Sequence, residues 1–285
     1  ENKINLPTTK IYTAIIGSNP STTARSPILW NKVYKKKKIK VNMLALDVKK
    51  KNINKLINFL EKDKNFIGGA VAVPFKEVIF KSLKNNIQND AKKIGAINCL
   101  YKNKLGKLVG INTDGESALF VFKKKFGKIN NKNIAIIGFG GVGKAVASFF
   151  SKDAAKVTIF SRKLKDKQLC KKYKYKWLKF DKIEKNISDY DVIINCTSIG
   201  FDKNLKKTPI REKVIKQLSK KTIIFDVIYN PLITKLIRLS KKNKIKTING
   251  SEMNIYQAVI AFMQVNSFVN KKDKENVTKI MKSAI

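Results

Sequence analysis

The sequence predicts an α/β protein with two domains, in which strands of parallel sheets alternate with helices. Two observations carry this prediction. Short apolar runs alternate with amphipathic stretches along almost the whole chain, which is typical of parallel α/β architecture. The chain has 285 residues, of which 43% are hydrophobic, so it can form one large or two medium-sized domains with a sizeable core.

The first part of the chain is expected to form an N-terminal α/β domain. Apolar runs predict its strands, and amphipathic stretches predict its helices. The expected strands are 11–17, 41–48 and 69–73, and the expected helices are 27–34, 53–60 and 77–83. A hairpin of 96–101 and 107–112 is expected around a turn that contains Gly106.

A second series of strands and helices begins near Asn133, after a helix expected over 115–126. Its expected strands are 134–137, 156–160, 191–195, 222–227 and 246–248, and an apolar helix over 253–268 and a lysine-rich tail follow. We therefore expect a first domain of residues 1–114 and a second of 115–249. The C-terminal residues 250–285 are expected to return to the first domain.

The charge of the chain is strongly positive, with 61 Lys and Arg against 20 Asp and Glu and a net charge of +41. Its lysines are spread along the chain, whereas nucleic-acid binding requires a basic stripe or patch. Lys, Asn and Ile share A/T-rich codons, so a biased genome explains the excess. We expect no nucleic-acid partner, although the charge should help to attract anionic ligands.

The chain contains no histidine, which excludes His-ligated metals and imidazole acid–base chemistry. Proton transfer must fall to Lys, Asp, Glu, Tyr, Cys or water. Cys99, Cys170 and Cys196 lack metal-ligand spacing and suggest a reducing compartment. No apolar run reaches the roughly 18 residues of a membrane span, and the first ten residues do not read as a signal peptide. We expect a cytoplasmic monomer or homodimer with no metal site and no membrane partner.

A glycine-rich turn marks the candidate cofactor site. The strand 134–137 runs directly into Gly138-Phe139-Gly140-Gly141-Val142-Gly143, and a helix is expected to follow. Such a turn lets backbone N–H groups approach a pyrophosphate at a helix N-terminus. The sequence therefore predicts a Rossmann-type dinucleotide-binding domain with Gly138, Gly140, Gly141, Val142 and Gly143 at the cofactor. A glycine-rich turn without a ligand is the alternative.

The end of the next strand favours NADP over NAD. Proteins that bind NAD usually carry an acidic residue there, which accepts a hydrogen bond from the ribose 2′-OH. This chain has Ser161, Arg162 and Lys163 instead. A guanidinium can hold a 2′-phosphate through two hydrogen bonds, so we expect these residues to bind that group.

Several further segments show a resemblance to a known family. They are Val73–Glu77 (VPFKE), Gly95–Asn98 (GAIN), Asn112–Gly115 (NTDG), Asn195–Gly200 (NCTSIG), Asp226–Pro231 (DVIYNP) and Tyr256–Ala258 (YQA). With these motifs in order, residues 11–268 resemble shikimate dehydrogenase and its relatives. The resemblance implies reversible hydride transfer between NADP(H) and a small-molecule hydroxy acid, the reduction of 3-dehydroshikimate to shikimate on the aromatic amino-acid route.

The resemblance also implies roles for individual residues. Lys76 and Asp114 are expected to handle the proton that accompanies hydride transfer. The other expected contacts are Ser26 and Arg25 with the substrate carboxylate, Asn98 and Gln257 with its hydroxyls, Tyr229 with the substrate, and Thr197, Ser198, Val227 and Gly250 with the cofactor. Simpler explanations remain open, namely a surface cation for Lys76, a helix N-cap for Asp114 and a polar helix rim for Gln257.

The chain departs from the family pattern where that pattern places polar substrate contacts. Ala24, Ala70 and Ala72 stand where the family usually has Ser, Asn and Thr. Each lost hydrogen bond is worth about 1 kcal/mol. Either Arg25, Thr22 or Thr23 replaces the missing donors, or the enzyme prefers quinate or another hydroxy acid. A non-catalytic NADP-binding protein is a further alternative.

Overall fold

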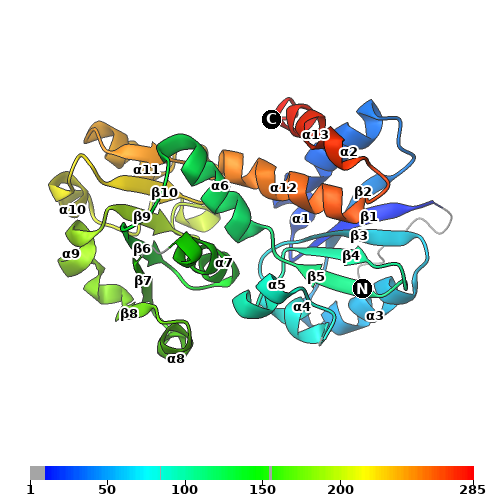
Figure 1. The fold of residues 1–285 in the computed structure, drawn as a ribbon, viewed down its shortest axis with the longest axis horizontal. Coiled ribbons are helices and arrows are strands. Elements are labelled where there is room, and N and C mark those ends of the chain that lie inside the picture. Colours follow the sequence, from blue (N-terminus) through cyan, green and yellow to red (C-terminus); the bar gives the residue numbers. More distant parts are fainter. Residues whose placement is uncertain (1–9, 84, 154–155) are drawn as a thin grey trace. The chain divides into compact units, whose positions relative to one another are not determined.

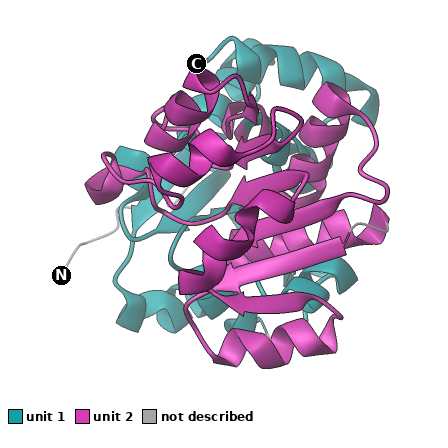
Figure 2. Cartoon of the chain, turned by 90° about the vertical axis from the view of Figure 1, so that its left-hand side faces the viewer, with its two compact units in different colours: residues 1–113, 255–285 teal, residues 114–254 magenta. Residues whose placement is uncertain are grey.

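The protein was examined as a computed structural model, which describes residues 10–83, 85–153 and 156–285. Residues 1–9 of the expected first domain therefore lie outside the described residues. The chain divides into two compact units (Figure 2). Unit 1 comprises Glu1–Thr113 and Ile255–Ile285, and unit 2 comprises Asp114–Asn254. Each unit contains its own sheet with helices packed on it, which confirms the predicted α/β class.

Unit 1 is built on a mixed sheet with the strand order β2-β1-β3-β4-β5 (Figure 1). Strand β1 (Tyr12–Gly17) runs parallel to both β2 (Asn42–Asp47) and β3 (Phe66–Val71). Strand β4 (Cys99–Lys102) runs antiparallel to β3 and to β5 (Leu108–Ile111), so the expected hairpin is confirmed. The hairpin extends the sheet at its edge and makes it mixed rather than wholly parallel.

Helices cover both faces of this sheet (Figure 1). Side chains alternate across a strand, so Tyr12, Ala14 and Ile16 of β1 join one core cluster and Ile15 joins the other. The first cluster includes α3 and α4, and the second includes α2, α12 and α13. The helical segments of unit 1, with α12 starting in unit 2, are α1 (Pro20–Thr23), α2 (Ser26–Lys36), η1 (Lys50–Asn52), α3 (Ile53–Lys62), α4 (Lys76–Ser82), α5 (Asn89–Ile94), α12 (Ser251–Val265), η6 (Lys271–Asp273) and α13 (Lys274–Lys282).

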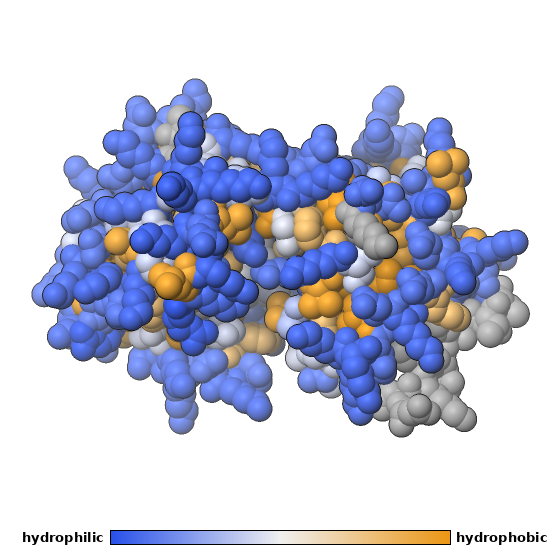
Figure 3. Space-filling view, turned by 90° about the horizontal axis from the view of Figure 1, so that it is seen from below, coloured by the Kyte–Doolittle hydropathy of each residue, from blue (hydrophilic) through white to orange (hydrophobic). Residues whose placement is uncertain are grey.

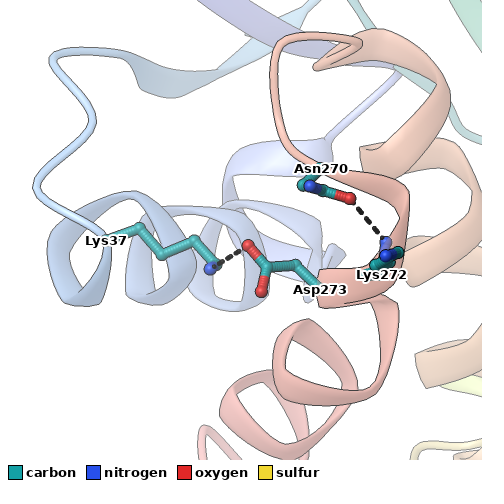
Figure 4. A network of polar contacts seen from close by, with 4 residues as sticks. All are labelled: Lys37, Asn270, Lys272 and Asp273. Atoms are coloured by element: carbon teal, nitrogen blue, oxygen red, sulfur yellow. Dashed lines mark hydrogen bonds and ion pairs between the residues drawn. The ribbon is translucent and has the colours of Figure 1, made fainter.

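The lysine-rich C-terminal segment forms a helix, α13, that packs on unit 1. Val277 and Met281, four residues apart on one helix face, are buried in the core cluster that also holds α2. Two polar contacts accompany this packing (Figure 4). Lys37 pairs with Asp273 at 2.8 Å, and Asn270 accepts a hydrogen bond from the N–H of Lys272.

Unit 2 is built on a parallel sheet with the strand order β11-β10-β9-β6-β7-β8. The chain starts in the middle at β6, proceeds outward through β7 and β8, and then returns to the other side of β6. This reversal creates a topological switch point at the carboxyl ends of β6 and β9, the place where such sheets bind ligands. The strands are β6 (Asn133–Ile137), β7 (Lys156–Ser161), β8 (Lys176–Lys179), β9 (Val192–Asn195), β10 (Ile223–Asp226) and β11 (Lys246–Ile248).

The central strands of unit 2 are buried on both faces, which explains their unbroken apolar sequences. Helices α10 and α11 pack on the face that carries Ala135, Ile193 and Ile224. Strand β8 was not predicted, because it has only four residues and a lysine stands at each of its ends. The helical segments are α6 (Asp114–Phe126), α7 (Gly141–Phe150), η2 (Ser151–Asp153), α8 (Lys165–Lys172), η3 (Phe180–Lys182), α9 (Ile183–Asn186), η4 (Ile187–Asp189), η5 (Asp202–Asn204), α10 (Glu212–Gln217) and α11 (Lys235–Lys242).

Hydrophilic side chains dominate the face that Figure 3 shows. Hydrophobic residues appear between them in smaller areas. Within the described ranges, no helix is both long enough and apolar enough to cross a membrane.

The packing of α13 generates a test. Replacing Met281 by Ala should lower the free energy of unfolding by about 2–4 kcal/mol, because it leaves a cavity in the core of unit 1. Urea unfolding measures this loss. Lys279→Ala on the exposed side of the same helix is the control and should change stability by less than about 0.5 kcal/mol. Equal effects of the two substitutions would contradict a structural role for α13.

Candidate active site

A buried polar network joins three distant segments of unit 1. Asn98, only 2% exposed, precedes β4. Its Nδ2 donates to Thr113 Oγ1 at 2.9 Å and to Gln257 Oε1 at 3.2 Å, and its Oδ1 accepts from the Thr113 N–H at 2.9 Å. Thr113 Oγ1 also donates to the backbone carbonyl of Gln257. The structure thus brings together Asn98 and Gln257, both predicted from sequence, through Thr113, whose part was not predicted.

Lys76 is anchored beside this network through its backbone. It is the first residue of α4, and its carbonyl accepts a hydrogen bond from the N–H of Ile97 at 3.0 Å. Asn98 follows Ile97, and its backbone carbonyl accepts a hydrogen bond from the N–H of Val71 at the end of β3. The Lys76 residue is half-buried. Two separate sequence motifs therefore converge at one end of the unit 1 sheet.

Asp114 begins helix α6 and follows Thr113 directly in the chain. Its residue is only 4% exposed. A carboxylate is favoured in the first turn of a helix, where the backbone N–H groups carry partial positive charge. Next to it, a Cβ on Gly115 would lie 2.3 Å from the carbonyl oxygen of Ala145, so α6 and α7 approach closely here and a larger residue at 115 would clash.

Ser26 and Arg25 lie at the start of α2. Ser26 is buried, and Nη1 of Arg25 is inaccessible to solvent. The hydroxyls of Thr22 and Thr23 both donate to the carbonyl of Asn19, the N-cap residue of the short helix α1. Their protons are therefore already used in hydrogen bonds within the protein. Of the three residues that were expected to replace the missing donors, Arg25 therefore remains the best candidate.

The alanines that depart from the family pattern lie in apolar surroundings. Ala24, Ala70 and Ala72 all belong to, or pack against, the core cluster that contains α2 and α12. Ala72 donates its N–H to the carbonyl of Ile16, and its Cβ would lie 3.1 Å from a Cβ on Gly17. The ends of β1 and β3 therefore meet at a surface without the hydroxyl and amide groups that the family pattern has there.

In unit 2, the glycine-rich turn fits a dinucleotide. Gly138 has a φ of +93°, and a Cβ on Gly143 would lie 2.1 Å from the Gly138 carbonyl oxygen, so both positions require glycine. Beside Gly140, by contrast, a Cβ would meet no atom of the described residues within 4 Å. This open space adjoins Gly141 and Val142 in the first turn of α7, where backbone N–H groups can bind a pyrophosphate.

The loops after β9, β10 and β11 carry four of the other predicted cofactor residues, and Ser161, Arg162 and Lys163 lie at the end of β7. A Cβ on Gly138 would lie 2.8 Å from Cγ2 of Thr197, so the loop of Thr197 and Ser198 packs on the glycine-rich turn. A Cβ on Gly250 would lie 2.0 Å from the Val227 carbonyl oxygen, so these two residues also adjoin. Tyr229 follows two residues after Val227 and is half-buried.

Comparison with known proteins decides the family. The model of the shikimate dehydrogenase substrate binding domain matches residues 15–100, and the model of shikimate / quinate 5-dehydrogenase matches residues 121–250. The chain is 33% identical to the NADP(+) shikimate dehydrogenase of Methanococcus vannielii over 96% of each chain. The chain belongs to the shikimate dehydrogenase family.

Further relatives agree with this assignment. The NADP(+) shikimate dehydrogenase of Methanocaldococcus jannaschii is 35% identical over 88% of this chain and 90% of its own. A crystal structure of a shikimate dehydrogenase in complex with NADP+ superposes with a TM-score of 0.83 at 30% identity, covering 98% of this chain and 97% of that one. The predicted family, fold class and enzyme class are thereby confirmed, and these relatives use NADP(+), the predicted cofactor.

A buried carboxylate supports the loops of the dehydrogenase's unit 2, and the sequence motifs gave no indication of its role. Asp226 ends β10 opposite Asn195 of β9 and is fully buried. Its Oδ1 accepts from Asn195 Nδ2 at 3.1 Å and from the Ile228 N–H at 3.2 Å, and its Oδ2 accepts from Thr234 Oγ1 at 2.7 Å. Asn195 Oδ1 in turn accepts from the N–H and Oγ1 of Thr197. This chain of bonds positions Thr197 against the glycine-rich turn.

Burial raises the pKa of the Asp226 carboxyl from 3.8 to about 6, although the bonds from Thr234, Ile228 and Asn195 oppose this shift. Burial likewise raises the pKa of the neighbouring Cys196 thiol, and the charges of Asp226 and Asp114 add to the effect. Cys196 is therefore protonated at neutral pH and unsuited to be a nucleophile. Over the part of the chain that the structure describes, no cluster of three or more His, Cys, Asp or Glu side chains could hold a metal ion.

The Asp226 shift predicts a pH-dependent stability. The folded protein keeps the Asp226 proton up to about pH 6, whereas the unfolded chain loses it near pH 3.8. Stability relative to an Asp226→Asn variant should therefore fall as the pH rises from 4 to 6, by at most about 3 kcal/mol. Urea unfolding of both proteins across this range measures the difference.

Asp189→Asn is the matched control, because Asp189 is exposed to solvent. Its stability difference from the parent protein should not follow the same curve. A constant difference between the parent and Asp226→Asn would show that burial does not perturb Asp226.

Proposed function

We propose that this protein is an NADP-dependent shikimate dehydrogenase that catalyses the reversible reduction of 3-dehydroshikimate to shikimate. The observation that carries the proposal is the buried Asn98–Thr113–Gln257 network beside Lys76, a set of polar groups suited to a small hydroxylated ring. In this proposal, unit 1 binds the substrate and unit 2 binds NADP.

The proposed chemistry requires a proton donor for the carbonyl oxygen. Bound NADPH supplies the hydride that reaches the carbonyl carbon. As that carbon is reduced, its oxygen must gain a proton, and a positioned side chain makes this transfer efficient. Lys76 gives up this proton during reduction and takes it back during oxidation. Asp114 is the second residue proposed to take part in this proton transfer.

The remaining polar groups of unit 1 bind and orient the substrate. Gln257 accepts from Asn98 through Oε1, which directs the donor end of its amide toward a different partner. That end suits the oxygen of a ring hydroxyl. Ser26 and Arg25, together at the start of α2, bind the substrate carboxylate, and an Arg–carboxylate pair is stronger than a neutral hydroxyl contact. Tyr229 is a further proposed substrate contact.

The cofactor contacts follow the carboxyl edge of the unit 2 sheet. The glycine-rich turn from Gly138 to Gly143 binds the pyrophosphate, and Arg162 with Lys163 binds the 2′-phosphate, helped by Ser161. The side chains of Arg162 and Lys163 are both exposed, so a phosphate can reach them from solvent. The Arg162 guanidinium can then donate two hydrogen bonds to it. The other proposed contacts are Thr197, Ser198, Val227 and Gly250.

A second candidate substrate has its own observation in favour. Ala24 and Ala72 pack among apolar side chains, and the hydroxyls of Thr22 and Thr23 serve Asn19. A hydroxy acid with fewer hydrogen-bonding groups than shikimate therefore fits the same site. Absence of turnover at millimolar shikimate, in a protein that binds NADPH, would favour this second candidate.

The role of Lys76 can be tested by substitution. Lys76→Ala should lower turnover by at least about 100-fold, because the proton donor is lost. The affinity for NADPH, measured by the fluorescence of the bound cofactor, should stay within about twofold, since Lys76 lies outside unit 2. Lys81→Ala in the last turn of the same helix is the control and should retain full turnover. Full turnover by Lys76→Ala would remove Lys76 from the mechanism.

The apolar end of the sheet can also be tested. Restoring hydroxyls in Ala24→Ser and Ala72→Thr should each lower KM for shikimate about fivefold, one hydrogen bond apiece. Ala45→Ser, which adds a hydroxyl elsewhere along the same core cluster, should leave KM unchanged. If KM does not fall in either substituted protein, shikimate is not bound at this end of the sheet.

A further inference from the structure

A tryptophan on the edge strand of unit 2 contacts the candidate 2′-phosphate loop. Trp177 lies on β8, opposite Ile159 of β7. Its Nε1 donates a hydrogen bond to Oγ of Ser161 at 2.8 Å, two residues further along β7. Diagonal neighbours on one sheet face lie within reach of a long aromatic side chain. The indole therefore leans along the sheet toward the carboxyl end of β7, where Ser161 and Arg162 stand.

This contact determines what the Ser161 hydroxyl can do. An indole N–H can only donate, so the Ser161 oxygen must be the acceptor in this bond. The hydroxyl proton is thereby directed to some other acceptor. Among the described residues, no side chain or carbonyl accepts it. Ser161 is only 4% exposed, so a nearby ligand is the natural partner for this proton.

The chemistry of that ligand follows from the groups around it. Arg162 and Lys163, which come next in the chain, are both donors and both cationic. A phosphate offers only acceptor oxygens and negative charge, so it matches all three groups. A ribose 2′-OH is poorly matched, because it prefers an acceptor such as a carboxylate.

We propose that Trp177 is a specificity-determining positioning residue, which holds the Ser161 hydroxyl as a donor to the 2′-phosphate of NADP and so favours NADP over NAD. The inference rests on the proposed function, in that NADP is the cofactor of unit 2. It goes further by naming a residue that acts on the cofactor only through another side chain.

The test uses substitutions that separate this role from simple packing. Trp177→Phe keeps an aromatic ring on β8 but removes the N–H, and Ser161→Ala removes the hydroxyl. Each should weaken binding of 2′,5′-ADP about fivefold while binding of 5′-ADP changes less than twofold. The double variant should be no weaker than Ser161→Ala alone, because both changes remove the same interaction. Isothermal titration calorimetry measures all of these affinities.

Tyr175→Phe is the matched control. It keeps a ring near the start of β8 and removes one polar group, the hydroxyl that lies 3.2 Å from Ser151 Oγ. It should leave the ratio of the affinities for 2′,5′-ADP and 5′-ADP unchanged. Equal weakening of both nucleotides by Trp177→Phe would mean that the residue acts only through packing. Additive losses in the double variant, or an unchanged ratio, would likewise overturn the proposal.

The binding assay separates this inference from the proposed enzyme activity. If the protein binds 2′,5′-ADP with the expected dependence on Trp177 but does not oxidise shikimate, the proposed substrate is wrong and the role of Trp177 stands. If shikimate is oxidised with NADP and Trp177→Phe leaves the ratio of kcat/KM for NADP and NAD unchanged, the activity stands and the inference fails.

Discussion

Hydrogen bonding by buried amide side chains is the constraint on which both units depend. A buried amide must have its donors and its acceptor paired, so its partners are held in a fixed arrangement. Asn98 connects Thr113 to Gln257, which lies 159 residues after Asn98 in the chain. Asn195 plays the same part in unit 2, where it links the Asp226 carboxylate to Thr197. The loops that carry the proposed site residues are positioned by these amides.

Charge and specificity have separate sources in this protein. A net charge of +41 attracts any anionic ligand over long distances, but it cannot distinguish one anion from another. Discrimination requires groups held at short range in a defined orientation. On the proposed cofactor side these are Arg162 and a Ser161 hydroxyl oriented by Trp177. On the proposed substrate side they are Asn98, Gln257 and the residues at the start of α2.

Much of the fold could be predicted, because buried parallel strands leave unbroken apolar runs in the sequence. The strand at 134–137 and the strand at 191–195 were found in this way, within a residue of β6 and β9. Helix α13 and strand β8 were missed, because lysines at their exposed positions mask the few apolar residues that pack inward. The excess of lysine in this chain weakens the periodic pattern on which such predictions depend.

The sequence by itself determined the α/β class, the glycine-rich turn after β6 and the cations at the end of β7, since each of these is a local pattern with a direct physical reason. Only the tertiary structure decided which polar groups meet. It joined Asn98 to Gln257, directed the Thr22 and Thr23 hydroxyls to Asn19, and set the indole of Trp177 against Ser161. Such contacts depend on strand register and on side-chain direction, and neither is encoded in the residues next to them along the chain.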